Sequence, residues 1–339
     1  VLTFAQYYRR SVTPERIRKG RALLKKYRPI LDRVTRETGV PGRFLIAFWG
    51  METNYGGFTG NTPIIRALAT LAYEGRREKF FTRELIAALK IVQNNHFKLH
   101  QLKGSWAGAM GQVQFMPSNY LRYGRDGNGD GRVDLWNTLE DAFLSAGYFL
   151  AHLGWHGGET WGREVKLTRR FSRYELADGV RRRSLSEWAK LGVVRADGRP
   201  LPKKGPMAAL WLPMGHTGPA FLLYPNFYVI KKWNHSYNYA LSVGLLADAI
   251  VGRPLRAWLP QKPAGIPRAR LRAIQQALKA QGYAIGKVDG IFGGRSRTAL
   301  RKWQQEQGLP ADGWPSETIW WKLHEQKQQA QSRTVADRH

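Results

Sequence analysis

A long apolar run that ends in a single glutamate constrains this chain more than any other feature. Residues 44–49 read Phe-Leu-Ile-Ala-Phe-Trp, and Gly50-Met-Glu52-Thr-Asn-Tyr-Gly56 follows directly. Pro41 suits a first helical position, where no amide hydrogen is needed, and the glycines at 56 and 57 supply a stop. On this predicted helix Glu52 shares a stripe with the large apolar side chains three, four and seven residues before it. The pattern therefore predicts a carboxylate at the rim of a core or inside an apolar cleft.

Such a glutamate is suited to acid catalysis. Burial among apolar groups would raise the pKa of its carboxyl group, and so would the negative end of the helix dipole, because Glu52 lies in the last turn. A carboxylic acid that stays protonated near neutral pH is what general acid catalysis needs. The alternative is a glutamate whose carboxylate reaches solvent at the helix end, and it fits these residues equally well.

The charge and the composition narrow the class of protein. The 339-residue chain has a formal net charge of +29, which favours an anionic partner: a nucleic acid, an anionic lipid, or a carboxylate-rich polymer such as a cell wall. A basic surface with no specific partner is the alternative. The chain has no cysteine, which excludes thiol catalysis, disulfides, cysteine zinc sites and an anchor on cysteine within it.

Length and hydropathy bound the architecture. With 43% hydrophobic residues and 13 tryptophans, the chain can form a large core, and its length suggests two or three domains. No apolar run approaches the ~18 residues of a membrane span, so we expect no transmembrane segment. The chain begins with Val1 rather than Met, which fits a processed or trimmed chain whose targeting segment is not part of this sequence.

The order of periodic segments predicts a mainly α protein of the α+β class. Amphipathic helices are expected at 13–39 and from Pro63 to about His96, a β-rich insertion with a short helix at about 165–228, and an apolar helix at 237–251. Four prolines then mark a linker, 254–267. Helices near 268–281, 295–307 and 315–325 predict a small three-helix domain at 268–325. Its two Asp-Gly turns, at 289 and 312, hint at an internal duplication, and the polar tail 326–339 is expected to be disordered.

A glycine-rich stretch among aromatic residues is the second unusual segment. It reads Gly104-Ser-Trp-Ala-Gly-Ala-Met-Gly-Gln-Val-Gln-Phe-Met-Pro-Ser118. Small residues at this density favour close approach of backbone segments over a long helix. Ser105 and Gln114 would then be polar groups on a tight scaffold, suited to hydrogen bonds with a sugar or an amide. A tightly packed connector is the alternative.

Residues 126–137 match the spacing of an EF-hand calcium loop. Side chains with oxygen donors stand at Asp126, Asn128, Asp130 and Asp134, a glycine takes the sixth position, and Arg132 would contribute its carbonyl. The twelfth position is Asn137 rather than a bidentate glutamate, which predicts weaker binding of calcium (or sodium). The alternative is a turn rich in aspartate and glycine.

Taken together, these stretches resemble the lytic murein transglycosylases related to membrane-bound lytic transglycosylase B. The matching pieces are the Glu52 segment, 105–118, the 126–134 loop and Asn234-His-Ser-Tyr-Asn-Tyr239, in the family's order within residues 1–252. Residues 270–323 separately resemble a peptidoglycan-binding domain of the three-helix type. The resemblance implies a lysozyme-like catalytic domain at 1–253. It also implies cleavage of the MurNAc–GlcNAc β-1,4 bond of peptidoglycan without water, to give 1,6-anhydro-MurNAc ends.

The resemblance also implies roles for individual residues. Glu52 would be the only catalytic carboxylate. The substrate would be contacted by Ser105, Gln114, Arg76, Arg77, Tyr148, Asn234 and Tyr239, with Tyr7 on a looser alignment. Phe80 departs from the family's pattern, where a tyrosine is expected. No cofactor would be needed for the chemistry, and the loop ion would be structural.

Other functions stay open on the residues alone. A hydrolytic muramidase would need a second carboxylate near Glu52, and none is close in sequence. A non-catalytic binder of the cell wall would not need the glutamate. A nucleic-acid partner is not expected, because no motif of that class is present and the basic residues are dispersed. We expect a periplasmic monomer on peptidoglycan glycan strands, with other cell-wall enzymes as further partners.

Overall fold

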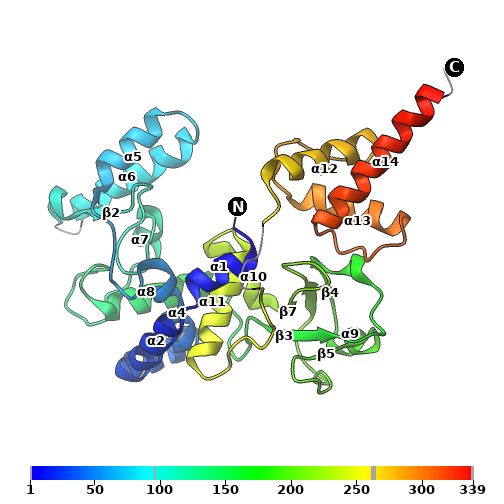
Figure 1. Cartoon of the computed structure of the whole chain (residues 1–339). Coiled ribbons are helices and arrows are strands. Elements are labelled where there is room, and N and C mark those ends of the chain that lie inside the picture. The colour runs from blue at the N-terminus through cyan, green and yellow to red at the C-terminus, as the bar shows by residue number, and fades with distance from the viewer. Residues whose placement is uncertain (1, 95–96, 261–264, 337–339) are drawn as a thin grey trace. The chain divides into compact units, whose positions relative to one another are not determined.

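The computed structural model describes residues 2–94, 97–260 and 265–336, and most of these residues lie in helices. The chain divides into two units, one of residues 8–161 and 225–255 and the other of residues 1–7, 162–224 and 256–339 (Figure 1). Helix α1 (Phe4–Ser11) runs across this division. This division groups residues that lie close together, whereas a domain is a segment that folds by itself. The predicted domain boundaries therefore stay a proposal.

The first unit is helical, with one short antiparallel strand pair, β1 (Thr62–Pro63) and β2 (Lys103–Gly104). Its α-helices are α2 (Pro14–Lys26), α3 (Arg28–Thr38), α4 (Gly42–Thr53), α5 (Ile64–Tyr73), α6 (Glu78–Asn94), α7 (Pro117–Tyr123), α8 (Leu139–His152), α10 (Pro225–Trp233) and α11 (Tyr237–Ile250).

Two of the helices expected from the sequence are each divided in the structure. The segment 13–39 forms α2 and α3, because Pro29 in the first turn of α3 has no amide hydrogen to continue the preceding ladder. The segment from Pro63 forms α5 and α6, and Gly75 turns the chain between them with φ +78°. The expected end of that segment, at His96, lies outside the described residues.

Helix α4 lies at the centre of this unit and packs against α2, α3, α8 and α11. Every residue from Phe44 to Gly50 is buried. The helix ends at Thr53, earlier than the predicted stop, because Asn54 and Tyr55 take the left-handed conformation. The ring of Tyr55 folds back over Gly50, where a Cβ would lie only 2.7 Å from Cζ of that ring. Gly50 therefore allows the turn that fixes the end of α4, where Glu52 lies.

The second unit contains an antiparallel sheet in the order β4-β6-β7-β3-β5. Its strands are β3 (Gly162–Leu167), β4 (Asp178–Arg183), β5 (Val193–Arg195), β6 (Ala208–Trp211) and β7 (Ala220–Leu223), with helix α9 (Leu185–Lys190) between β4 and β5. Leu210, Leu222 and the indole of Trp188 are fully buried in its core. The β-rich insertion is confirmed, but it ends before α10, and the arginine-rich β4 lacked the apolar alternation that identifies a strand.

The C-terminal helices of this unit are α12 (Arg268–Ala280), α13 (Gly294–Glu306) and α14 (Glu317–Ala336), packed around Ile274, Leu300 and Trp303. The prediction of a disordered tail from 326 is wrong for the described residues, since α14 continues through Ala336. Glutamine, alanine and lysine are good helix formers, and they carry the helix on without an apolar stripe.

The two Asp-Gly turns are held in the same way, as the hinted duplication requires. The side-chain oxygen of Gln275 accepts a 2.8 Å hydrogen bond from the N–H of Gly290, and that of Gln304 accepts one of 2.8 Å from the N–H of Gly313. The second turn has a further partner, because Oδ2 of the buried Asp312 also accepts the backbone N–H of His216 at 2.9 Å. The turn at 312 is therefore joined to the loop between β6 and β7.

Candidate active site

The carboxyl group of Glu52 meets two donors that lie far away in the sequence. Oε1 accepts a hydrogen bond from the indole Nε1–H of Trp233 at 3.1 Å and another from the hydroxyl of Tyr239. Trp233 is the last residue of α10, and Tyr239 lies in the first turn of α11. Three helices therefore bring these groups together, and α4, α10 and α11 are seen in Figure 1.

Aromatic rings surround this group. The ring of Trp233 lies 4.5 Å from that of Phe48, 5.6 Å from that of Phe115 and 5.1 Å from that of Phe149, measured between centroids. Burial in these surroundings raises the pKa of Glu52 from 4.5 to about 7, although the hydrogen bonds from Tyr239 and Trp233 act in the opposite direction. Glu52 therefore keeps a protonated form at neutral pH, which general acid catalysis requires.

Gln112 supports the end of α4 and was missed in the sequence. Its side-chain oxygen accepts the indole N–H of Trp49 at 2.7 Å, and its amide donates to the carbonyl of Trp136 at 2.8 Å. The hydroxyl of Thr53, next to Glu52, donates to the backbone carbonyl of Gln112 at 2.9 Å. The sequence signal that could have identified Gln112 was its polar side chain within the glycine-rich stretch.

The glycine-rich stretch folds back on itself by backbone bridges from Gly104 to Met110 and from Met110 to Phe115. The hydroxyl oxygen of Ser105 accepts the N–H of Ala109 at 3.0 Å. Gln114 takes a left-handed φ of +53°, and its amide donates to the carbonyl of Thr59 at 3.0 Å. Gln114 thus stands directly before Phe115, whose ring belongs to the aromatic surroundings of Glu52. The expected tight scaffold is present.

Three further candidate residues, Arg76, Arg77 and Asn234, lie at exposed positions. Arg76 and Arg77 lie exposed in the turn between α5 and α6, with the guanidinium of Arg77 4.1 Å from the ring centre of Phe80. Asn234 is exposed directly after Trp233, and its side-chain oxygen accepts the N–H of Ser236 at 3.2 Å.

The contacts of Tyr148, on α8, are with Glu37 and Arg125. The hydroxyl of Tyr148 donates to Glu37 of α3 at 3.3 Å, and the guanidinium of Arg125 lies 4.8 Å from the centre of its ring. Tyr7 lies on α1 in the other unit.

The loop at 126–134 is organised by its own amide groups. Asp126 accepts the N–H groups of Gly129 and Gly131, each at 2.7 Å, and Asp130 accepts the N–H of Arg132 at 2.9 Å. Asn137 donates to Asp134 at 3.0 Å. Over the residues that the structure describes, no three acidic or histidine side chains form a metal-binding group. The donors are nevertheless hard oxygens at EF-hand spacing, so their chemistry fits calcium.

Asp141, on α8, closes this loop and was missed in the sequence. Its buried carboxylate accepts the N–H of Gly127 and the N–H of Asp134, each at 2.7 Å. Burial raises its pKa. Two acidic residues, Glu140 and Asp141, in the first turn of a largely apolar helix were the available signal.

Comparison with known families decides the class. The family of the transglycosylase SLT domain matches residues 1–248, and a putative peptidoglycan binding domain matches residues 267–323. The chain belongs to the transglycosylase SLT family. The resemblance predicted from the sequence and the predicted fold class are thereby confirmed.

Relatives with known names support this membership. Membrane-bound lytic murein transglycosylase B of Escherichia coli K12 is 34% identical over 247 residues, which cover 72% of this chain and 66% of the relative. The crystal structure of SltB3 from Pseudomonas aeruginosa in complex with NAG-anhNAM-pentapeptide is 43% identical, with a TM-score of 0.89 over 96% of this chain and 87% of that one. Escherichia coli Slt35 in complex with calcium is 32% identical, with a TM-score of 0.65 over 73% and 78% of the two chains.

Proposed function

We propose that this chain is a lytic transglycosylase that cleaves the MurNAc–GlcNAc β-1,4 bond of peptidoglycan and leaves 1,6-anhydro-MurNAc ends. The observation that carries the proposal is Glu52, a carboxyl group whose pKa lies near 7 inside an aromatic cluster. The causes of that pKa are burial and two hydrogen bonds, and no neighbouring acid of the described chain is among them. A glycosidase that uses water needs a second carboxylate, either as nucleophile or as base.

One residue can perform both proton transfers. Glu52 first gives its proton to the glycosidic oxygen, and the bond from that oxygen to the anomeric carbon breaks. The C6 hydroxyl oxygen of the same MurNAc then bonds to the anomeric carbon, and its proton passes to the Glu52 carboxylate. Glu52 ends the cycle protonated, and no water is consumed.

Both donors meet Oε1, which leaves Oε2 as the oxygen that carries the transferred proton. An oxygen that already accepts an N–H and an O–H is the poorer site for a proton, because its lone pairs are engaged. The same two bonds stabilise the carboxylate after it has given up its proton. Tyr239 and Trp233 therefore orient the acid and hold its conjugate base.

Substrate contacts follow from the candidate residues. We assign Ser105 and Gln114 to the sugar at the cleaved bond, and Arg76 and Arg77 to peptide carboxylates or sugar oxygens. Asn234 lies beside Trp233 and would contact a sugar on that side. For Tyr148 and Tyr7 the assignment rests on the family resemblance alone.

The experiment is a digest of purified peptidoglycan with wild type and Glu52→Gln, with the new MurNAc ends identified by mass spectrometry. Anhydro ends, lighter than hydrolysed ends by one water and absent with the variant, are the expected result. Reducing ends would mean a muramidase. Binding to the wall without any release would mean a non-catalytic protein.

We propose that Asp126, Asn128, Asp130, Asp134 and the carbonyl of Arg132 bind calcium as a structural ion. The calcium complex of the 32% identical Slt35 supports this proposal, together with the spacing of the oxygens. Adding calcium should raise the melting temperature of wild type but not that of Asp130→Ala. Equal shifts in both proteins would remove the assignment.

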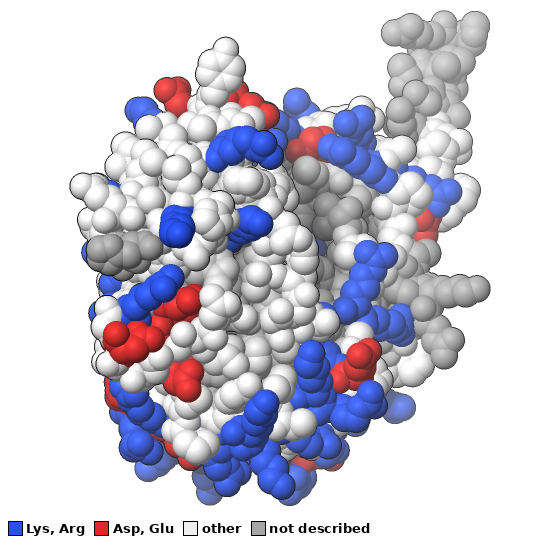
Figure 2. Space-filling view, turned by 90° about the vertical axis from the view of Figure 1, so that its left-hand side faces the viewer, with Lys and Arg blue, Asp and Glu red and all other residues white. Residues whose placement is uncertain are grey.

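The surface and the family support a place on the cell wall. On the face shown in Figure 2, lysine and arginine side chains are spread over the surface rather than gathered in a stripe, so a nucleic-acid partner is not favoured. No helix in the described parts of the chain is long and apolar enough to cross a membrane. We propose the periplasm as its location, and a monomer as its state. Fractionation of cells and light scattering of the purified protein would test these two assignments.

A further inference from the structure

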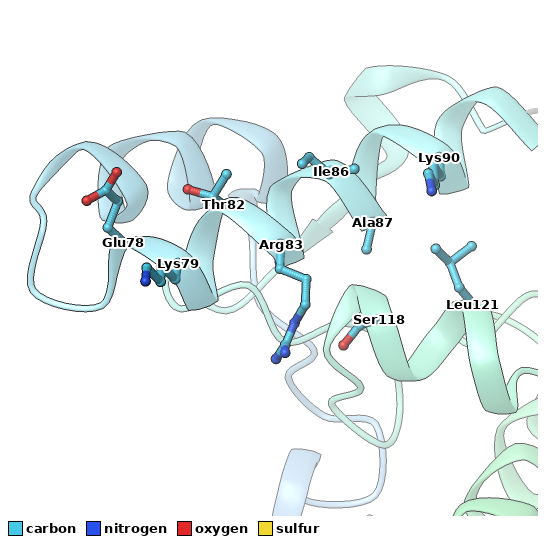
Figure 3. A pocket seen from close by; sticks show the side chains of 9 residues that line it. All are labelled: Glu78, Lys79, Thr82, Arg83, Ile86, Ala87, Lys90, Ser118 and Leu121. Atoms are coloured by element: carbon cyan, nitrogen blue, oxygen red, sulfur yellow. The ribbon is translucent and has the colours of Figure 1, made fainter.

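A groove on the helical unit is not used by the chemistry at Glu52. Figure 3 shows it between α6 and α7, with Arg83 and Ala87 extending from α6 toward α7, where Ser118 and Leu121 lie. Its volume is about 530 Å³. A pocket of this size can hold a ligand of a few residues.

The walls of the groove are fixed to each other by a buried carboxylate. Glu84 of α6 is 1% exposed, and it accepts the backbone N–H of Ser118 at 2.9 Å and the hydroxyl of Ser118 at 2.8 Å. The guanidinium of Arg83 also lies 3.5 Å from this carboxylate, and the two bonds from Ser118 hold α7 against α6. The groove is therefore a stable feature of the surface.

The groove is basic and partly apolar. Lys79, Arg83 and Lys90 line it at a spacing that places them along one side of α6, and Glu78 is the acidic residue among its lining. Exposed apolar side chains alternate with these cations: Ile86 is 50% exposed and Leu121 39% exposed. Cations beside small apolar surfaces suit a ligand that carries carboxylates on a short chain with small side chains.

The groove is also close to the reaction centre along the chain. Ser118 follows Phe115 by three residues, and three residues of extended chain span at most roughly 11 Å. The ring of Phe115 packs on Trp233, which donates to Glu52. One wall of the groove is therefore connected to the surroundings of Glu52 through Phe115.

We propose that the α6–α7 groove binds a short acidic peptide, the chemical class of the peptide branches of peptidoglycan. This inference rests on the proposed function, since the branch is present only on that substrate. The carboxylates would pair with Lys79 and Lys90, and the methyl groups of the peptide would cover Ile86 and Leu121. The site adds affinity for glycan strands that carry peptides, without a part in bond cleavage.

The first test is a titration of the wild-type protein with the free peptide branch released from peptidoglycan, followed by NMR or calorimetry. The double variant Lys79→Gln/Lys90→Gln should bind this peptide roughly tenfold more weakly, because two exposed charge pairs are lost. Arg18→Gln/Lys25→Gln on α2 removes the same charge from exposed positions and should bind as wild type does. An equal loss in both variants, or no loss in the groove variant, would overturn the proposal.

The second test separates this proposal from the proposed function. Wild type and the groove variant are compared on glycan strands with peptides and on strands stripped of peptides by an amidase. The expected result is a higher KM for the groove variant on peptide-bearing strands only, with kcat unchanged. Equal effects on both strands overturn the groove while cleavage stands. If wild type cleaves neither strand, the proposed function fails, and the peptide titration still decides the groove.

Tighter binding to phosphatidylglycerol vesicles than to the peptide would overturn the proposal in favour of a lipid surface.

Discussion

Replacing Glu52 by glutamine should make the protein more stable at alkaline pH than the wild type. The carboxyl group has a pKa of about 7 in the folded chain and 4.5 without its surroundings. As the pH rises, the unfolded chain loses this proton first, so ionisation favours unfolding. The stability that the protonated acid provides is complete below pH 4.5 and is lost as the pH rises through 7.

The magnitude follows from linkage. Each tenfold change in a protonation equilibrium corresponds to about 1.4 kcal/mol, so the change from 4.5 to about 7 corresponds to roughly 3 kcal/mol. Nearly all of it should be lost between about pH 4 and pH 8. Glutamine cannot ionise, and its side-chain oxygen can still accept the bonds from Tyr239 and Trp233. The Glu52→Gln variant should therefore lack this part of the pH dependence.

The assay is guanidinium unfolding of both proteins, followed by tryptophan fluorescence at a series of pH values. The difference in unfolding free energy between variant and wild type is plotted against pH, because all other titrating groups contribute equally to both. Glu15→Gln, which changes an exposed glutamate of α2, is the matched control. A difference between Glu52→Gln and wild type that stays constant from pH 4 to pH 8 would refute the reasoning, since it would mean that Glu52 is not desolvated.

Three further predictions follow from the same geometry. Above a pH of about 7 the kcat/KM of wild type on purified peptidoglycan should fall about tenfold per pH unit, as the acid form of Glu52 disappears; a decline centred near pH 4.5 would contradict this. In Tyr239→Phe the carboxylate loses a donor, so its pKa should rise and the alkaline decline should move to higher pH, whereas a shift to lower pH would show that the hydroxyl does not stabilise the charge. Gln112→Ala leaves the indole N–H of Trp49 without its acceptor and should lower the unfolding free energy by about 1–3 kcal/mol; an unchanged denaturation midpoint would mean that water replaces the amide.

The sequence predicted the position of Glu52 because the relevant signals are local. Apolar side chains at helical spacing and a stop after the glutamate lie within one short segment. The loop at 126–134 was similarly visible from spacing alone. Pro29 and Gly75 divide two of the expected helices, and each was present in the sequence, but the apolar period of the surrounding residues outweighed it.

The partners of Glu52 could not be predicted from local pattern. Trp233 and Tyr239 lie 181 and 187 residues away from it in the sequence, and nothing in the periodicity of either segment points to α4. Tyr239 was found through the family resemblance, but Trp233 was missed, although it stands directly before Asn234 in the matching motif. Asp141 was missed for a different reason: its side chain bonds to backbone N–H groups, which carry no identity in a sequence. Gln112 bonds to a backbone carbonyl and to the indole of Trp49, which lies 63 residues away.

The two roles of Glu52 place opposite demands on its surroundings, and the site meets them with different groups. An acid needs a high pKa, which the rings of Phe48, Phe115 and Phe149 supply by excluding water around Trp233. A base needs a stable anion, which the bonds from Trp233 and Tyr239 supply. Rings alone would hold the proton too tightly for transfer, and donors alone would leave a carboxylate with no proton to give. A pKa near 7 is the balance of the two, and near neutral pH it leaves both the acid and its conjugate base populated, as a residue with both roles needs.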